Sequence, residues 1–332
     1  MIDDDASEPD LVDRAGDRIA EGDLAGALAA ALRALEEDED SPEGHHVVGY
    51  VYALEGKLQA ALQHYLRAIA VDGGFFDALL QAADVLLQLG ETRRAESLVE
   101  DALDLAETAE ERADALLLHV DTLLTAGRRE EAVMAASALP EGPFAAPELD
   151  FRVGRARFEV GDLQGAAPLL ELAARRPGAS ADAYYFYGLV LDERDDPAAM
   201  AAAFVQCRDA DLATPRFPWA EPLATFERRV SRALQRLPSS LGAPLEGALV
   251  VVDEVPGAEL VSEGFGPRAS CLFEEVELPR RAGDPARLAR LFVYQRNVER
   301  AAGTPDRIDE ELDLALRAEI QAVLNGPPRP TP

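Results

Sequence analysis

Few side chains in the sequence could do acid–base or metal chemistry, because the 332-residue chain contains only four histidines. Three of them, His45, His46 and His64, fall close together, and imidazoles are common zinc ligands. No cysteine or carboxylate stands beside them at a spacing typical of a zinc site. We therefore expect these histidines to pack in the fold or to lie on its surface, and the sequence predicts no metal site.

The sequence also offers no clear nucleophile. Ser270 and Cys271 are the candidates, but each would need a base, and no histidine follows His119. The glycine pair in residues 264–266 lacks the third glycine and the strand-to-helix setting of a nucleotide-binding turn, so we expect a loop there. No cofactor is predicted.

The charge of the chain is strongly negative, with 62 acidic and 32 basic residues and a formal net charge of −30. Nucleic acids and anionic membranes both attract positive surfaces, so this balance argues against either partner and favours a basic one. The N-terminal sequence is acidic, no apolar run is long enough to cross a bilayer, and the two cysteines stand far apart. We expect a cytoplasmic protein without disulfides.

Glycine and alanine recur at a fixed period in the first two thirds of the chain. Five glycines stand 34 residues apart, except for one step of 37 between the third and the fourth: Gly22, Gly56, Gly90, Gly127 and Gly161. Asp195 follows the last of them by 34 residues and takes the place of a sixth glycine. Alanines follow the first three glycines after five and twelve residues: Ala27 and Ala34, Ala61 and Ala68, Ala95 and Ala102. This pattern predicts stacked helical hairpins, in which glycine ends the first helix and alanine allows close approach of neighbouring helices.

The pattern resembles the tetratricopeptide repeat, most clearly in the second unit, with Gly49, Tyr52, Ala61, Tyr65 and Ala68 at the expected places. Gly188 and Phe204 mark the sixth unit. The resemblance implies a helical solenoid over residues 8–214, after a short tail at 1–7. The expected units are 8–41, 42–75, 76–109, 113–146, 147–180 and 181–214.

Repeats of this kind form a concave groove lined by one face of each first helix. Carried onto this sequence, the resemblance places mostly carboxylates and aromatic side chains on that face: Glu43, His46 and Tyr50; Asp77, Leu80 and Asp84; Asp114, Leu117 and Asp121; Glu148, Phe151, Arg155 and Glu159; Asp182, Tyr185 and Asp192. The candidate binding residues are His46, Tyr50, Asp84, Asp121, Phe151, Arg155, Tyr185 and Asp192.

Arg155 is expected to be the one cation on this face. The face is therefore expected to bind a basic or amphipathic protein segment, with charge steering the encounter and aromatic side chains anchoring the complex. The alternative is that these carboxylates are part of a generally acidic, solvated surface.

The repeat pattern of glycine and alanine ends near Thr214, and a different pattern of residues follows. A proline-rich stretch at 215–222 contains Trp219, and we expect an amphipathic helix at 226–237, a buried strand at 249–252 and another strand at 291–294. Thr304 is the expected N-cap of a last helix, whose core stripe repeats every fourth residue: Ile308, Leu312, Leu316, Ile320 and Leu324. Residues 326–332 are expected to form a disordered tail.

The order of these elements over residues 226–324 resembles the small bacterial zincin-like metallopeptidase domain. The segments that carry the resemblance are FERRVSRALQRLPSSL, ALVVVDEVP, LFEEVELPRR and LFVYQRNVERAA. In that family the last helix carries His-Glu-x-x-His, in which two histidines bind zinc and the glutamate activates water. Here the matching positions are Ala318, Glu319 and Ala322, so the resemblance implies the fold over 215–325 without its zinc site. Glu319 is then expected to be an ordinary exposed glutamate.

The sequence thus predicts a mainly α protein: a tetratricopeptide-repeat solenoid followed by a small α+β zincin-like domain. We interpret it as a non-catalytic interaction scaffold with a protein or peptide partner, and with neither nucleic acid nor membrane as a partner. An active zinc metallopeptidase with relocated ligands is the alternative. A third interpretation is an adaptor whose second domain senses a ligand.

Overall fold

The computed structural model describes residues 11–245, 247–277 and 287–325. The chain falls into two compact units, Met1–Ala173 and Ala174–Pro332. The predicted tails at 1–7 and 326–332 lie outside the described residues.

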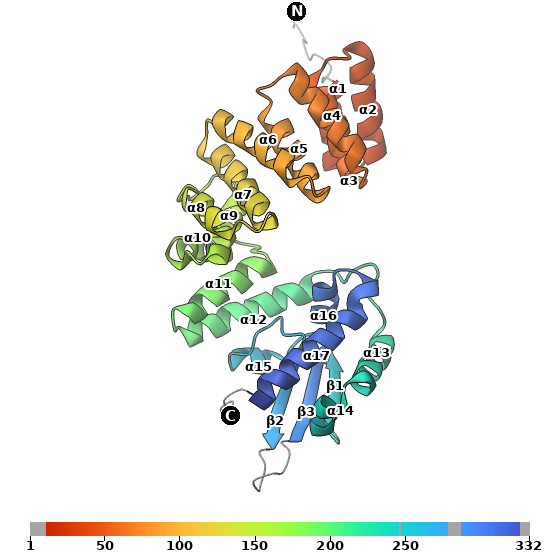
Figure 1. Cartoon of the computed structure of the whole chain (residues 1–332), viewed down its shortest axis with the longest axis vertical. Helices are drawn as coiled ribbons and strands as arrows, with labels where there is room; N and C mark the ends of the chain where they lie inside the picture. The colour runs from red at the N-terminus through yellow and green to blue at the C-terminus, as the bar shows by residue number, and fades with distance from the viewer. Residues whose placement is uncertain (1–10, 246, 278–286, 326–332) are drawn as a thin grey trace, which may run out of the picture. The chain divides into compact units, whose positions relative to one another are not determined.

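The first unit consists of helical hairpins that follow one another along the chain (Figure 1). The helices are α1 (Leu11–Ala20), α2 (Leu24–Glu37), α3 (Pro42–Leu54), α4 (Leu58–Val71), α5 (Phe76–Gln88), α6 (Thr92–Leu105), α7 (Ala109–Thr125), α8 (Arg129–Ser137), α9 (Pro147–Val160) and α10 (Leu163–Arg175). Side-chain caps fix several of their starts: Ser41 accepts a hydrogen bond from the Gly44 amide (3.0 Å), and Thr108 and Glu111 form a reciprocal capping box. The predicted pairing of helices is confirmed.

The repeat glycines lie at the turns between the helices of each hairpin. All five have a positive φ, from 72° at Gly56 to 94° at Gly161, a conformation that glycine adopts without strain. In the second compact unit, Asp195 takes the same turn, with φ of 57°. The periodic alanines on the second helices are buried, and Ala61 and Ala95 are completely inaccessible to solvent. The expected roles of glycine and alanine are thus confirmed.

A second kind of glycine permits close packing inside a hairpin. A Cβ atom added to Gly49 on α3 would lie 2.7 Å from the ring of Tyr65 on α4. In the last hairpin, a Cβ atom added to Gly188 would lie 2.3 Å from the Phe204 ring. Both distances are shorter than van der Waals contact, so the aromatic ring of the second helix requires glycine on the first.

The fourth hairpin departs from the others. Its first helix, α7, has 17 residues where α3 and α5 have 13 each, which accommodates the longer step between Gly90 and Gly127. Its second helix, α8, has nine residues. The connection that follows is fastened by two buried polar side chains of α9: Asp150 accepts from the Phe144 amide (3.0 Å), and Arg157 donates to the Leu139 carbonyl (2.7 Å).

The second unit combines helices with a three-stranded sheet (Figure 1). Its elements are α11 (Ala181–Glu193), α12 (Pro197–Ala213), α13 (Leu223–Arg236), α14 (Ser239–Gly242), β1 (Leu249–Asp253), α15 (Ala258–Ser262), β2 (Cys271–Glu277), β3 (Arg287–Tyr294), α16 (Gln295–Ala302) and α17 (Ile308–Asn325). The strand order is β1-β3-β2, with β1 parallel and β2 antiparallel to the central strand β3.

The predicted core stripe of the last helix is confirmed, since Ile308, Leu312, Leu316 and Ile320 are all buried. They pack with residues of α13, β2, β3 and α16 in one apolar cluster. The side chain of Leu324, the fifth residue of the stripe, lies outside those that are described. The final helix begins at Ile308, after a 3₁₀ turn at Pro305–Arg307 that follows Thr304.

Two expectations about the sheet were wrong or incomplete. The apolar run at 249–252 forms β1, but it is not a buried strand: Leu249 is 59% exposed and Val250 is 39% exposed. The run lies at the edge of the sheet, where one side of a strand has no neighbour. The sequence analysis also placed no strand at Cys271–Glu277, which forms β2.

The compact units divide within α10, whereas the sequence analysis placed the domain boundary after Thr214. The last hairpin, α11–α12, belongs to the same compact unit as the sheet, and Val261 of α15 is buried against Met200 and Phe204 of α12. The predicted boundary at 214/215, like the zincin-like identity of the second domain, stays a prediction.

Candidate binding surface

The candidate binding residues all lie on first helices of their hairpins. His46 and Tyr50 lie on α3, Asp84 on α5, Asp121 on α7, and Phe151 and Arg155 on α9, within the first unit; Tyr185 and Asp192 lie on α11 in the second unit. Asp84, Asp121, Arg155 and Asp192 are exposed, and the four aromatic or imidazole side chains are half-buried. For the first unit, we call the exposed and half-buried residues on this face of α3, α5, α7 and α9 the first-helix surface.

The α3–α5 part of this surface is acidic and has no matching cation. Glu43, Asp77 and Asp84 are exposed, and in the described part of the chain none of them forms an ion pair. Asp84 accepts a hydrogen bond from Gln88 one turn later (2.8 Å). Charge on this part of the surface is therefore available to a partner.

His46 lies one turn after Glu43 on α3, and its ring contacts Phe75 at the start of α5, two residues before Asp77. Burial lowers the pKa of its imidazole, while the charges of Asp77 and Glu43 oppose that shift. The ring contacts Phe75 (centroids 5.0 Å apart) and Tyr65 (5.8 Å), and its buried Nε2 atom has no hydrogen-bond partner within the described chain. A flat ring with carboxylates near it suits a flat cation.

Tyr65 of α4 contacts both neighbouring first helices, through the His46 ring of α3 and Gln81 of α5. Its hydroxyl donates to Gln81 Oε1 (2.5 Å), and burial raises the pKa of its phenol, with further contributions from Tyr50 and Asp84. This arrangement joins α3, α4 and α5 beneath the acidic residues.

The α7–α9 part of the surface is different, because its carboxylates have arginine partners. Arg152 of α9 pairs with Asp114 of α7, and Arg155 Nε lies 2.7 Å from Glu159. Burial raises the pKa of Asp121, Glu159 adds to the shift, and Arg155 and Arg152 oppose it. The expectation that Arg155 would be the one cation was wrong, because Arg152 lies on the same side of α9.

One expected surface position is not exposed. Leu117 of α7, which was expected to line the groove, is buried in the core with Leu116 and Val120. The other two predicted positions of this helix, Asp114 and Asp121, are half-buried and exposed, so the carried-over pattern fails only at the apolar residue, which packs in the core.

In the second unit, the equivalent positions of α11 already have a partner from the same unit. Arg268, in the loop between α15 and β2, lies over the ring of Tyr185, with its guanidinium carbon 4.7 Å from the ring centroid. The same guanidinium pairs with Asp182 (2.6 Å) and with the buried Asp211 of α12 (3.1 Å). Asp192 lies exposed in the last turn of α11.

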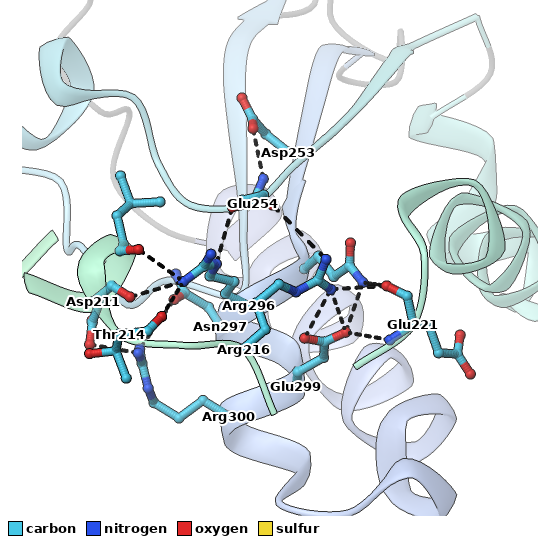
Figure 2. Close-up of polar contacts among 12 residues, drawn as sticks. Asp211, Thr214, Arg216, Glu221, Asp253, Glu254, Arg296, Asn297, Glu299 and Arg300 are labelled. Atoms are coloured by element: carbon cyan, nitrogen blue, oxygen red, sulfur yellow. Dashed lines mark hydrogen bonds and ion pairs between the residues drawn. The ribbon is translucent and has the colours of Figure 1, made fainter. Parts of the chain in front are cut away.

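A polar cluster that the sequence analysis missed lies where α16 meets the end of α12 and the proline-rich segment (Figure 2). Arg296 Nη1 donates to the carbonyls of Asp211 and Thr214 (both 3.0 Å), and its Nε donates to Glu254 (3.1 Å). Arg300 reaches the carboxylate of Asp211 (2.6 Å). Only the spacing of Arg296 and Arg300, which places them on one side of a helix, is visible in the sequence.

On the other side of α16, Glu299 is the centre of the cluster. Its carboxylate is 1% exposed and accepts from Arg216 Nη2 (3.1 Å), as Figure 2 shows. It also accepts from Gln295 Nε2 (2.7 Å). A cavity of about 290 Å³ lies beside these residues and is lined by Arg216, Arg268, Arg296 and Arg300 together with Asp182, Asp211 and Glu299. Because carboxylates pair with the arginines, the cluster holds the elements of the second unit together and is not an open anion site.

The positions that resemble a zinc motif lie in α17 and show no metal site. Ala318 and Ala322 are exposed, and their methyl groups offer no ligand atom. Glu319 was expected to be an ordinary exposed residue, but it is half-buried, and its carboxylate accepts from the Phe273 amide of β2 (3.4 Å). Over residues 11–245, 247–277 and 287–325 no group of three or more histidine, cysteine, aspartate or glutamate side chains could hold a metal ion.

The clustered histidines of the first unit include one direct pair. His45 Nδ1 lies 3.1 Å from His64 Nδ1, and His45 Nε2 lies 3.0 Å from the carbonyl of Glu39. One ring must donate a proton and the other must accept it, so the pair requires at least one neutral imidazole.

Comparison with known proteins finds one matching family model and several solved structures with a similar fold. A family model described as "Tetratricopeptide repeat" matches residues 12–74. The structure of pilF from Pseudomonas aeruginosa is 16% identical, with a TM-score of 0.51 over 60% of this chain and 89% of that chain. That of PilW, a type IV pilus biogenesis factor, is 17% identical, with a TM-score of 0.49 over 65% and 96%.

A further similar structure is a thermophilic tetratricopeptide-repeat protein from Thermus thermophilus. It is 18% identical, with a TM-score of 0.44 over 55% of this chain and 97% of that one. No curated protein matches the sequence. Among the described helices, none is both long and apolar enough to cross a membrane.

Proposed function

Because the chain contains tetratricopeptide repeats, we propose that it is a non-catalytic scaffold that binds a basic or amphipathic protein segment on the first-helix surface. The observation that carries the proposal is the unmatched charge of Glu43, Asp77 and Asp84 beside the half-buried side chains of His46 and Tyr50. Carboxylates without ion-pair partners attract a cationic segment, and aromatic side chains can anchor it.

The charge of the whole chain supports a basic partner. A net charge of −30 raises the encounter rate with a cationic segment and keeps anionic macromolecules away. The α7–α9 part of the surface would contribute less to this attraction, because Arg152 and Arg155 offset its carboxylates.

For the second domain we propose a binding or capping role without catalysis. The positions that would carry zinc ligands in a zincin-like fold are Ala318 and Ala322, and the buried polar contacts of α16 serve to join α12 to the sheet. A cytoplasmic location is part of the same proposal and rests on the composition of the chain.

The proposal is tested with a cationic amphipathic peptide labelled with a fluorophore. Asp84→Asn combined with Asp121→Asn should weaken binding by about tenfold, and binding to the unmodified protein should weaken as the ionic strength rises past about 0.1 M, where the Debye length is about 10 Å. The matched control is Asp101→Asn with Asp104→Asn, which removes two exposed carboxylates from the second helix α6. Equal weakening by both double variants would show a diffuse effect of charge and would count against this surface.

A further inference from the structure

Arg268 shows how α11 binds a guanidinium group. Its guanidinium carbon lies 4.7 Å from the centroid of the Tyr185 ring, and its Nη2 atom pairs with Asp182 at 2.6 Å. Asp211 completes the contact from α12 (3.1 Å). The guanidinium group thus contacts one aromatic ring and two carboxylates, which suits its delocalised charge and its fork of donors.

Asp182 and Tyr185 occupy positions that recur in the other first helices. Each of five first helices has such a pair of positions, three residues apart on the same helix face. The first position is a carboxylate in every pair: Glu43 and His46, Asp77 and Leu80, Asp114 and Leu117, Glu148 and Phe151, Asp182 and Tyr185. The carboxylate is constant in these five helices, and a flat ring follows it in three of them.

A second position of this series also pairs with an arginine of the chain. Asp114 on α7 takes the guanidinium of Arg152 from α9. Among the described residues, therefore, two of the five first-position carboxylates bind an arginine side chain, in separate compact units of the molecule.

The pair on α3, Glu43 and His46, also consists of a carboxylate followed by a flat ring, but no arginine of the described chain pairs with it. Glu43 lies one turn before His46 on α3, and the His46 ring contacts Phe75, which is two residues before Asp77. Neither carboxylate forms an ion pair in the described chain. The His46 ring is supported by Phe75 and Tyr65. The site therefore contains a flat ring and two carboxylates, as the Arg268 site does.

We propose that Glu43, His46 and Asp77 form a subsite for an arginine side chain of the protein partner, with the guanidinium on the imidazole face and its edge against the two carboxylates. This inference rests on the proposed function of the first-helix surface. It specifies arginine rather than lysine, because an ammonium group has neither a flat face to stack on the ring nor two donors in one plane.

Two dodecapeptides test the inference, one with arginine at every third position and the other identical except for lysine at those positions. Titration of the full chain by fluorescence anisotropy should give an affinity for the arginine peptide about five- to tenfold higher than for the lysine peptide. Glu43→Gln with Asp77→Asn should remove most of this preference. The matched control, Glu100→Gln with Asp104→Asn on α6, should keep it.

Substitution of the ring separates stacking from charge. His46→Phe should keep the preference for arginine because it keeps a flat face, whereas His46→Leu should bring the two affinities together. Melting curves of both variants check that α3 still folds, and if His46→Leu unfolds the protein, the carboxylate double variant decides alone.

The outcomes distinguish this inference from the function on which it rests. If both peptides bind equally and equally salt-dependently, the acidic surface holds and the arginine subsite is wrong. If neither peptide binds, the proposed function fails. If the preference for arginine survives Glu43→Gln with Asp77→Asn, the subsite lies elsewhere on the chain and the assignment to these residues is overturned.

Discussion

The carboxylate of Glu299 is almost fully buried, and the guanidinium of Arg216 reaches it with an Nη2–Oε1 distance of 3.1 Å. The two residues are 83 positions apart in the sequence, and the pair connects the proline-rich segment to α16. Gln295 and the Glu221 amide donate to the same carboxylate. A charge buried in this way depends on its partners, because water cannot replace them.

Removing Arg216 should therefore destabilise the second unit strongly. Arg216→Met leaves the Glu299 carboxylate buried without its cation and should lower the free energy of unfolding by about 3–5 kcal/mol. Chemical denaturation measures the loss. The control is Arg307→Met, which removes an exposed pair with Glu310 and should cost about 1 kcal/mol or less. Losses of the same size in the two variants would contradict a special dependence of Glu299 on Arg216.

Close packing of the second hairpin should make Ala61 intolerant of a larger side chain. Ala61 on α4 is fully buried, so Ala61→Leu should overpack the hairpin and lower the free energy of unfolding by about 1–3 kcal/mol. Ala29→Leu places the same side chain at an exposed position of α2 and is the control. An unchanged melting temperature in Ala61→Leu would mean that the helix contacts at this alanine are looser than described.

The first unit should lose stability as the solution becomes mildly acidic. Burial lowers the pKa of His46 and of His64 below the ordinary value of 6.5, and His45 adds to the shift at His64. The unfolded chain then binds protons more readily than the folded one, so stability falls once the pH drops below about 6.5 and continues to fall until the folded imidazoles titrate.

Chemical denaturation at pH 7.5 and at pH 5.5 measures the free energy of unfolding in both conditions and should give the lower value at pH 5.5. His46→Phe combined with His64→Phe should remove much of the difference between the two conditions, because neither site can then take up a proton. Carboxylates titrate in the same direction in both proteins, so the comparison isolates the histidines. Equal pH dependence of the unmodified protein and the double variant would contradict the prediction.

Purified protein should contain no stoichiometric zinc and should cleave no peptide. Ala318 and Ala322 cannot supply the two imidazoles that a zincin-like helix needs. Glu319→Ala should therefore leave metal content and peptide cleavage unchanged, and its effect should be limited to stability through the lost contact with the Phe273 amide. Elemental analysis showing about one zinc per chain, removable by a chelator with loss of an activity, would overturn this prediction and favour a metallopeptidase with relocated ligands.

The repeat was readable from the sequence because its physical requirements are local. A turn with positive φ favours glycine, as at Gly56 and Gly90, and a tight helix contact favours alanine, as at Ala61, so the period of these residues predicted the hairpins. The final helix was equally clear from its apolar stripe. In both cases the constraint acts within one or two neighbouring helices.

The features that the sequence analysis missed depend on distant parts of the chain. Nothing near Leu249 indicates that β1 lies at a sheet edge, because strand order is set by pairing with β3, which comes much later in the sequence. The pairing of Arg152 with Asp114, which changes the charge of the first-helix surface, likewise spans 38 residues. Residue types at these positions were visible, but their partners were not.

The dependence of Asp211 on Arg268 and Arg300 also bears on how the chain folds during synthesis. Asp211 is 5% exposed, and Arg268 follows it by 57 residues, with Arg300 later still. While a ribosome adds these residues at about 5–20 per second, the α11–α12 hairpin must wait for several seconds with an uncompensated carboxylate at its end. In the first unit, by contrast, the buried carboxylate of Asp150 accepts from the Phe144 amide only six residues away. The last hairpin is therefore expected to be completed at a later stage of synthesis, after α16 has left the exit tunnel.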